Sequence, residues 1–88
     1  MSAILVEELS SPGCQHCKAF EAFWNTVKDQ FPAVQYKNVS VVTPEGMELA
    51  QKHGIFASPG VIINGELFST GGVDKKKFLD ELKKRSDV

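Results

Sequence analysis

The sequence is poor in cysteine, in net charge and in long apolar runs. It has two cysteines in 88 residues, so it lacks the four or six dispersed cysteines that cross-link many small secreted domains. Its formal net charge of −1 offers no long-range attraction to nucleic acid or to an acidic membrane. We therefore expect neither of these as a partner.

The start of the chain also lacks the marks of a targeting segment. Residues 1–8 carry a short apolar run and no cationic stretch, which predicts neither a secretion signal nor a membrane span. Together with the low cysteine count, this pattern predicts a protein of the reducing cytoplasm.

The apolar residues that are present suffice for one small core. They make up 42% of the chain, and a domain of this length buries roughly 60–65% of the surface of its unfolded chain. Because no repeat, linker or low-complexity segment interrupts the sequence, we expect residues 1–88 to form a single domain.

Local patterns predict four strands and three helices. Apolar side chains at three- and four-residue steps indicate one long helix, and an Asn-Gly dipeptide between two apolar runs indicates a tight hairpin. In chain order the expected elements are a strand at 4–9, a helix from Cys14 to before Pro32, a strand at 33–42 with an irregularity near Asn38, a helix from Pro44 to His53, strands at 61–63 and 66–68, and a helix capped by Asp74.

The order of these elements, β-α-β-α-β-β-α, predicts the fold class. A strand–helix–strand start implies a parallel pair with a right-handed crossover, and a closing hairpin adds antiparallel strands. We expect an α/β fold in which three helices flank a mixed four-stranded sheet.

The segment Cys14-Gln15-His16-Cys17 carries the chemistry. Two thiols separated by two residues, where a turn enters a helix, can open and close a disulfide without moving the backbone. Cys17 lies on the apolar stripe of the helix and is expected to be buried. Cys14 is expected at the helix tip, where unpaired backbone amides point outward.

Three features together resemble the thioredoxin superfamily: the cysteine pair at the start of the first helix, Ala57-Ser58-Pro59 before the hairpin, and Asn64-Gly65 within it. The resemblance is closest to small thioredoxin-like and glutaredoxin-like proteins that lack the N-terminal strand and helix of the larger members. It implies a monomeric thiol-disulfide oxidoreductase of electron transport and cell redox homeostasis. Its partners would be protein disulfides and a recycling reductase or glutathione, with no metal or other cofactor.

Each residue of the cysteine motif then has an expected role. A thiolate attacks a disulfide, and the helix tip favours the anion, so Cys14 is the expected nucleophile and Cys17 resolves the mixed disulfide. A histidine before the second cysteine also occurs in protein disulfide isomerase and in the oxidase DsbA. By this resemblance His16 stabilises the Cys14 thiolate; the alternative is a solvent-facing side chain without effect. Gln15 is expected to line the substrate site.

Glu8, Ser58 and Pro59 are further candidates. Pro59 resembles the cis-proline of the family, which faces the cysteines, and Ser58 would present its backbone to an extended substrate. Glu8 lies six residues before Cys14, a spacing similar to that of the family's buried acid, which assists proton transfer to the second cysteine. Glu7 competes for the inward position, and a solvated strand end is the alternative for Glu8.

Gly71 and Gly72 resemble the glycine pair with which glutaredoxins hold glutathione. They fall later after Pro59 than in that family, and Val73 stands where glutaredoxins often carry cysteine or serine. The alternative is a turn before a helix.

A different function class also fits the cysteines. Cys14, Cys17 and His16 could bind zinc or an iron–sulfur cluster. A structural zinc site usually takes four ligands, so a site within one copy of this chain would be incomplete. A cluster shared by two copies, as some glutaredoxins form, stays open at this point.

Overall fold

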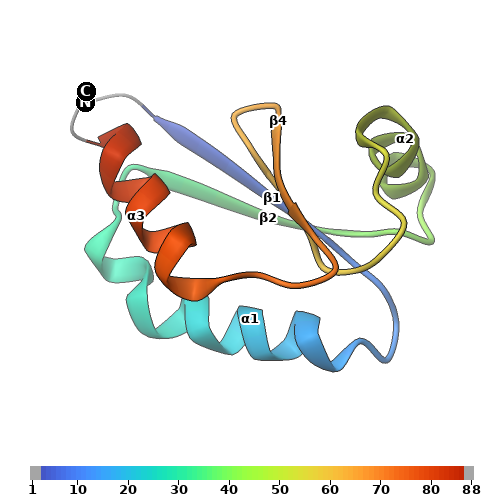
Figure 1. The fold of residues 1–88 in the computed structure, drawn as a ribbon, viewed down its shortest axis with the longest axis horizontal. Coiled ribbons are helices and arrows are strands. Elements are labelled where there is room, and N and C mark those ends of the chain that lie inside the picture. Colours follow the sequence, from blue (N-terminus) through green and yellow to red (C-terminus); the bar gives the residue numbers. More distant parts are fainter. Residues whose placement is uncertain (1–2, 87–88) are drawn as a thin grey trace.

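A four-stranded sheet runs through the protein and carries helices on both faces (Figure 1). The structure is a computed structural model and describes residues 3–86. Within this part of the chain no helix is long and apolar enough to cross a membrane. The elements in chain order are β1 (Ile4–Ser10), α1 (Gln15–Val27), the 3-10 turn η1 (Lys28–Gln30), β2 (Val34–Ser40), α2 (Pro44–His53), β3 (Gly60–Ile63), β4 (Glu66–Thr70) and α3 (Lys75–Ser86).

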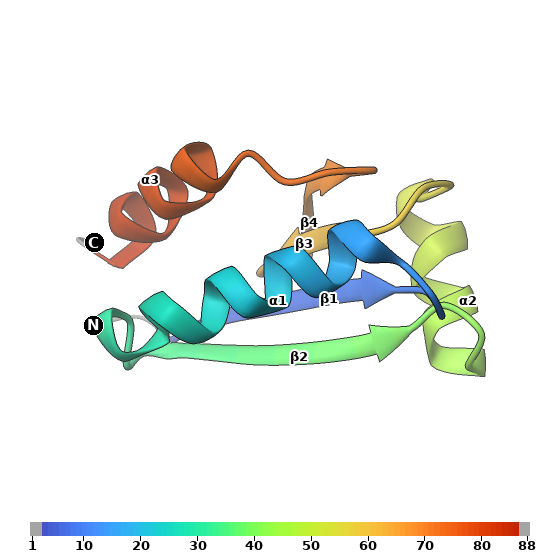
Figure 2. The ribbon, with the colours of Figure 1, turned by 90° about the horizontal axis from the view of Figure 1, so that it is seen from below.

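The strands lie in the order β2-β1-β3-β4. β1 pairs with β2 in parallel and with β3 antiparallel, and β3 pairs antiparallel with β4. The predicted mixed sheet and element order are thus confirmed. α1 and α3 cover one face, and α2 packs on the other, at the end of the sheet where β1 and β2 finish (Figure 2).

The prediction of an irregularity near Asn38 is wrong. β1 and β2 stay in register without interruption from Ile4 opposite Val34 to Ser10 opposite Ser40. Successive side chains of a strand alternate between the two faces. A regular strand can therefore carry one apolar set at even positions and another at odd positions. The register shift of this sheet lies instead between β3 and β4, at Val61 and Ile62.

Side chains cap α2 and α3, the second as predicted, and the predicted hairpin turn is present. The Gly46 amide donates to the Thr43 hydroxyl at 3.0 Å at the start of α2, and the Lys77 amide donates to Asp74 at 3.0 Å at the start of α3. Asn64 and Gly65 have φ values of 51° and 82°, the left-handed pair that a two-residue hairpin requires.

The sheet separates two clusters of buried apolar side chains. β3 contributes to both, because its residues are buried on both faces. The larger cluster, under α1 and α3, contains Ile4, Val6, Phe20, Trp24, Phe31, Val61, Ile63, Phe78 and Leu82. The smaller cluster, under α2, contains Leu9, Val39, Ile55 and Ile62.

Candidate functional site

Cys14 and Cys17 form a disulfide at the N-terminal end of α1. Their Cα atoms lie 5.3 Å apart, within the ordinary range for this bond. Cys14 caps the helix: its backbone is extended, and its sulfur accepts a hydrogen bond from the Cys17 amide at 3.0 Å. The first sulfur therefore lies where the free amides and the positive end of the helix dipole favour an anion.

The two sulfurs have different surroundings. The Cys17 side chain is buried, with 2% of its surface exposed, whereas Cys14 is partly exposed. The helical spacing predicted this difference. A molecule that approaches from solvent meets Cys14 first.

A pair of serine hydroxyls lies against Cys14. The Ser58 hydroxyl donates to the Cys14 sulfur at 3.5 Å, and its oxygen lies 2.6 Å from the Ser11 hydroxyl. With Ser58 donating to sulfur, Ser11 donates to Ser58. Neither side-chain contact is predicted from the sequence, because Ser11 and Ser58 are 47 positions apart and the resemblance implies only a backbone role for Ser58.

The loop that carries Ser58 is held in place by a buried cis-proline and by backbone hydrogen bonds from Gly71. The Ser58–Pro59 peptide bond is cis, as the resemblance implied, and Pro59 is fully buried. The Gly71 amide donates to the carbonyl oxygens of Ala57 and Pro59, both at 3.1 Å. Gly71 has a φ of 87°, and an added Cβ would lie 3.3 Å from the Ala57 Cβ. Gly71 thus supports the loop of Ser58 through its backbone, while Gly72 is exposed and an added Cβ there would meet no atom within 4 Å.

An apolar hollow of about 190 Å³ lies beside these serines. One of its lining residues, Phe56, is 95% exposed and was not singled out from the sequence. The hollow has room for one apolar side chain of an approaching partner. It is lined by Leu9, Ser11, Val41, Ile55, Phe56, Ala57 and Ser58.

Glu8 is the buried acid of the site. Its side chain has no exposed surface and shares a strand face with Ile4 and Val6, toward α1, because alternate residues of a strand point the same way. Glu7 points to the other face and is partly exposed. The strand alternation therefore decides the competition between the two glutamates for the inward position.

Burial raises the pKa of Glu8 from 4.5 to about 8. The Tyr36 hydroxyl, which donates to Glu8 Oε1, lowers this pKa, and the nearby carboxylate of Glu21 raises it. The other oxygen, Oε2, has no hydrogen-bond partner within residues 3–86. Glu8 is therefore mostly a neutral acid below about pH 8, as burial without a cationic partner favours the uncharged carboxyl.

Neighbouring polar side chains hold Glu8 in place. Burial, and next the hydrogen bond to Glu8, raise the pKa of Tyr36, so its phenol stays a donor. The Asn38 amide nitrogen lies 3.4 Å from Glu8 Oε1 and 2.8 Å from Glu21 Oε2, and its oxygen accepts from Ser10 at 2.7 Å. This group was not predicted from the sequence, although polar Tyr36 and Asn38 following Val34 at alternate positions could have indicated it.

Gln15 and His16 are both exposed at the start of α1. In the described part of the chain neither side chain makes a hydrogen bond to the cysteines. Over residues 3–86, no group of three or more His, Cys, Asp and Glu side chains is arranged to hold a metal ion. The structure therefore adds no further ligand to the cysteines and His16.

The raised pKa of Glu8 gives a prediction for stability. Between pH 4.5 and about 8 the native protein keeps a proton that the unfolded chain releases. The free energy of unfolding should fall as pH rises through this window, by on the order of 4 kcal/mol. Glu8→Gln, neutral throughout, should lack this fall. Denaturant titrations at several pH values measure it, with Glu45→Gln, from an exposed ion pair, as the control that keeps the wild-type slope. Parallel curves for wild type and Glu8→Gln would contradict the assignment.

Comparison with known proteins places the fold and the cysteine pair in one family. A family profile described as the thioredoxin domain matches residues 4–84. A thioredoxin of Methanocaldococcus jannaschii is 33% identical over 86 residues, which cover 97% of this chain and 99% of that protein.

Solved structures agree on the fold. The thioredoxin of Fasciola hepatica superposes with a TM-score of 0.74 at 17% identity, over 94% of this chain and 81% of the other. The oxidised mitochondrial thioredoxin 3 of Saccharomyces cerevisiae gives 0.75 at 18% identity, over 96% and 80%. In this fold, a proximal cysteine pair at the first helix supports thiol-disulfide oxidoreductase chemistry in general. The chain belongs to the thioredoxin domain family.

Proposed function

We propose that this protein reduces the disulfides of other proteins and is returned to its dithiol form by a reductase. The observation that carries the proposal is the unequal pair of sulfurs, with Cys14 reachable at the helix end and Cys17 buried behind it. The cysteines themselves carry the electrons, so the proposal requires no further cofactor. A protein substrate would lie across Ser58 and the hollow beside Phe56.

The exchange proceeds in two steps. The Cys14 thiolate attacks one sulfur of the substrate disulfide, forms a mixed disulfide and releases the other substrate sulfur as a thiolate. Cys17 then loses its proton and attacks the Cys14 sulfur, which releases the second substrate sulfur. Two electrons pass to the substrate, and the protein is left with the Cys14–Cys17 disulfide.

Glu8 supplies the acid–base group for Cys17. It faces the side of the sheet that α1 covers, where Cys17 is buried, and a pKa of about 8 lets it take up and release a proton near neutral pH. Glu8→Gln should therefore turn over more slowly at an equal folded fraction. An unchanged rate would remove Glu8 from the mechanism.

Glutathione is the alternative recycling reductant, and Gly71 and Gly72 are the residues that would meet it. A thioredoxin-type reductase is favoured, since the family profile and the archaeal relative are both thioredoxins. The assay is insulin reduction driven by dithiothreitol, in which the wild type should accelerate the reaction. Stoichiometric metal after purification under reducing conditions, together with no acceleration, would favour the metal-binding alternative and overturn the proposal.

Replacing Cys17 by serine should trap the reaction halfway. Without the second sulfur the mixed disulfide through Cys14 cannot be resolved, so Cys17→Ser should accumulate a covalent adduct with a disulfide substrate. Mass spectrometry of the non-reduced adduct identifies the linked residue. Cys14→Ser is the matched control and should form far less adduct; an equal yield through Cys17 would contradict the division of roles, and a higher one would reverse it.

The Ser58 hydroxyl should stabilise the Cys14 thiolate of the reduced protein. Ser58→Ala removes the donor now 3.5 Å from the sulfur, and the pKa of Cys14 is expected to rise by roughly half a unit, the worth of one weak hydrogen bond. The pH dependence of alkylation measures it. Ser58→Thr should keep the wild-type value, and an unchanged pKa in Ser58→Ala would refute the role.

His16 is proposed to make the disulfide a better oxidant by favouring the thiolate form of Cys14. His16→Pro should therefore shift the equilibrium with glutathione toward a more reducing protein by up to about tenfold, or 30 mV. Proline is tolerated in the first turn of a helix. His16→Ala distinguishes loss of the imidazole from the effect of proline on the backbone. If the imidazole is responsible, the equilibrium of His16→Ala with glutathione shifts as that of His16→Pro does. An unchanged equilibrium in both variants rejects the proposal.

A further inference from the structure

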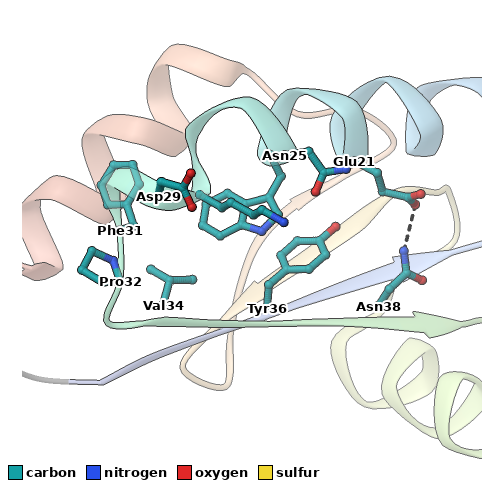
Figure 3. Close-up of a pocket in the computed structure, with 10 residues that line it drawn as sticks. Glu21, Asn25, Asp29, Phe31, Pro32, Val34, Tyr36 and Asn38 are labelled. Atoms are coloured by element: carbon teal, nitrogen blue, oxygen red, sulfur yellow. Dashed lines mark hydrogen bonds between the residues drawn. The ribbon is translucent and has the colours of Figure 1, made fainter.

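A groove of about 580 Å³ opens along the protein between α1 and β2 (Figure 3). Its walls are Trp24 and Glu21 from α1 and Tyr36 and Asn38 from β2. Neither cysteine lines it. The hollow beside Cys14 is lined by a different set of residues, so a partner seated there leaves the groove open to solvent.

The groove leads to Glu8. Two of its lining side chains, Tyr36 and Asn38, hydrogen-bond to the same oxygen of Glu8, and Glu8 itself has no exposed surface. These two side chains therefore stand between the buried carboxyl and solvent on this side of the sheet.

Only one of the two side chains is suited to carry a proton. The Asn38 amide is held at both ends, by Ser10 at its oxygen and by Glu21 at its nitrogen. The Tyr36 hydroxyl can donate one hydrogen bond while it accepts another, and it donates to Glu8. The second carboxyl oxygen, Oε2, has no partner in residues 3–86. Of the two groove-lining contacts, the phenol is thus the one that can link Glu8 to solvent.

We propose that Tyr36 passes protons between Glu8 and solvent in the groove, so that Glu8 can be reset while a protein substrate covers Cys14. The inference rests on the proposed reductase function. Inward, the Tyr36 hydroxyl gives its proton to the Glu8 carboxylate as a hydronium ion of the solvent gives one to the Tyr36 oxygen and is left as water. Outward, both transfers reverse. Tyrosine is unchanged after each transfer, and no electrons move.

Tyr36 is accordingly a positioning residue that acts through Glu8. The titratable group that faces Glu8 from α1, apart from the cysteines, is Glu21, which also lines the groove and raises the pKa of Glu8. Its carboxylate accepts from the Asn38 amide, which does not relay protons, so the Glu21→Gln variant below tests it separately from Tyr36. Tyr36→Phe removes the hydroxyl and keeps the ring, which stacks on Trp24 with centroids 5.4 Å apart. The variant should therefore fold, and thermal unfolding checks this.

The test compares steady-state turnover of two substrates near neutral pH. Insulin covers the cysteine face, whereas a small aromatic disulfide leaves it open to water. The turnover rate of Tyr36→Phe should fall at least about threefold with insulin and only a little with the small disulfide, because only the covered site depends on the groove. Imidazole, a small proton carrier, should restore the insulin rate.

Glu21→Gln is the matched variant. It should move the pH profile to lower pH on both substrates alike, because a charge that raises the pKa of Glu8 is gone, with no difference between substrates and no response to imidazole. Glu45→Gln, from an exposed pair with Lys37 that does not contribute to the pKa of Glu8, should leave both profiles unchanged.

Two results would overturn the inference: an equal loss on both substrates in Tyr36→Phe, which is a structural effect, or no loss on insulin. A wild-type protein that fails to accelerate insulin reduction rejects the proposed function instead. Failure of the proposed function is distinguishable from failure of the inference, because the wild type is assayed before any variant is compared.

Discussion

The hydrogen bond from the Cys17 amide to the Cys14 sulfur is the contact on which the site depends. It makes a sulfur, rather than a hydroxyl or carboxylate, the cap of α1. The first sulfur is therefore held at the positive end of the helix, and the second is one turn further along, on the face that packs against the sheet. One local geometry thus gives two thiols of the same chemistry different surroundings.

Two sides of the protein share the proposed reaction. In the proposed reaction Ser58, supported by the Gly71 amide on its loop, and the hollow beside Phe56 would face the substrate. Glu8, on the face of the sheet that α1 covers, would serve the buried sulfur. The separation matters because a reductase of proteins must move protons at a site that its own substrate covers.

The sequence predicted what short-range chemistry decides. The apolar stripe of the first helix placed Cys17 inward, and Asn64-Gly65 fixed the hairpin, because both patterns act over a few residues. Contacts between distant segments were missed: the Ser11 and Ser58 hydroxyls are 47 positions apart, and no local pattern brings them together. The sequence alone could not decide whether Glu7 or Glu8 points inward, because only the packing of the sheet shows which face α1 covers.

Competitive alkylation of the reduced protein tests the central claim that the two sulfurs are unequal. A limiting amount of iodoacetamide is added near neutral pH, and peptide mass spectrometry locates the label. The account predicts that Cys14 is labelled first and that Cys17 reacts in quantity only once the protein is unfolded. Equal labelling of both cysteines in the folded protein, or Cys17 ahead of Cys14, would contradict it.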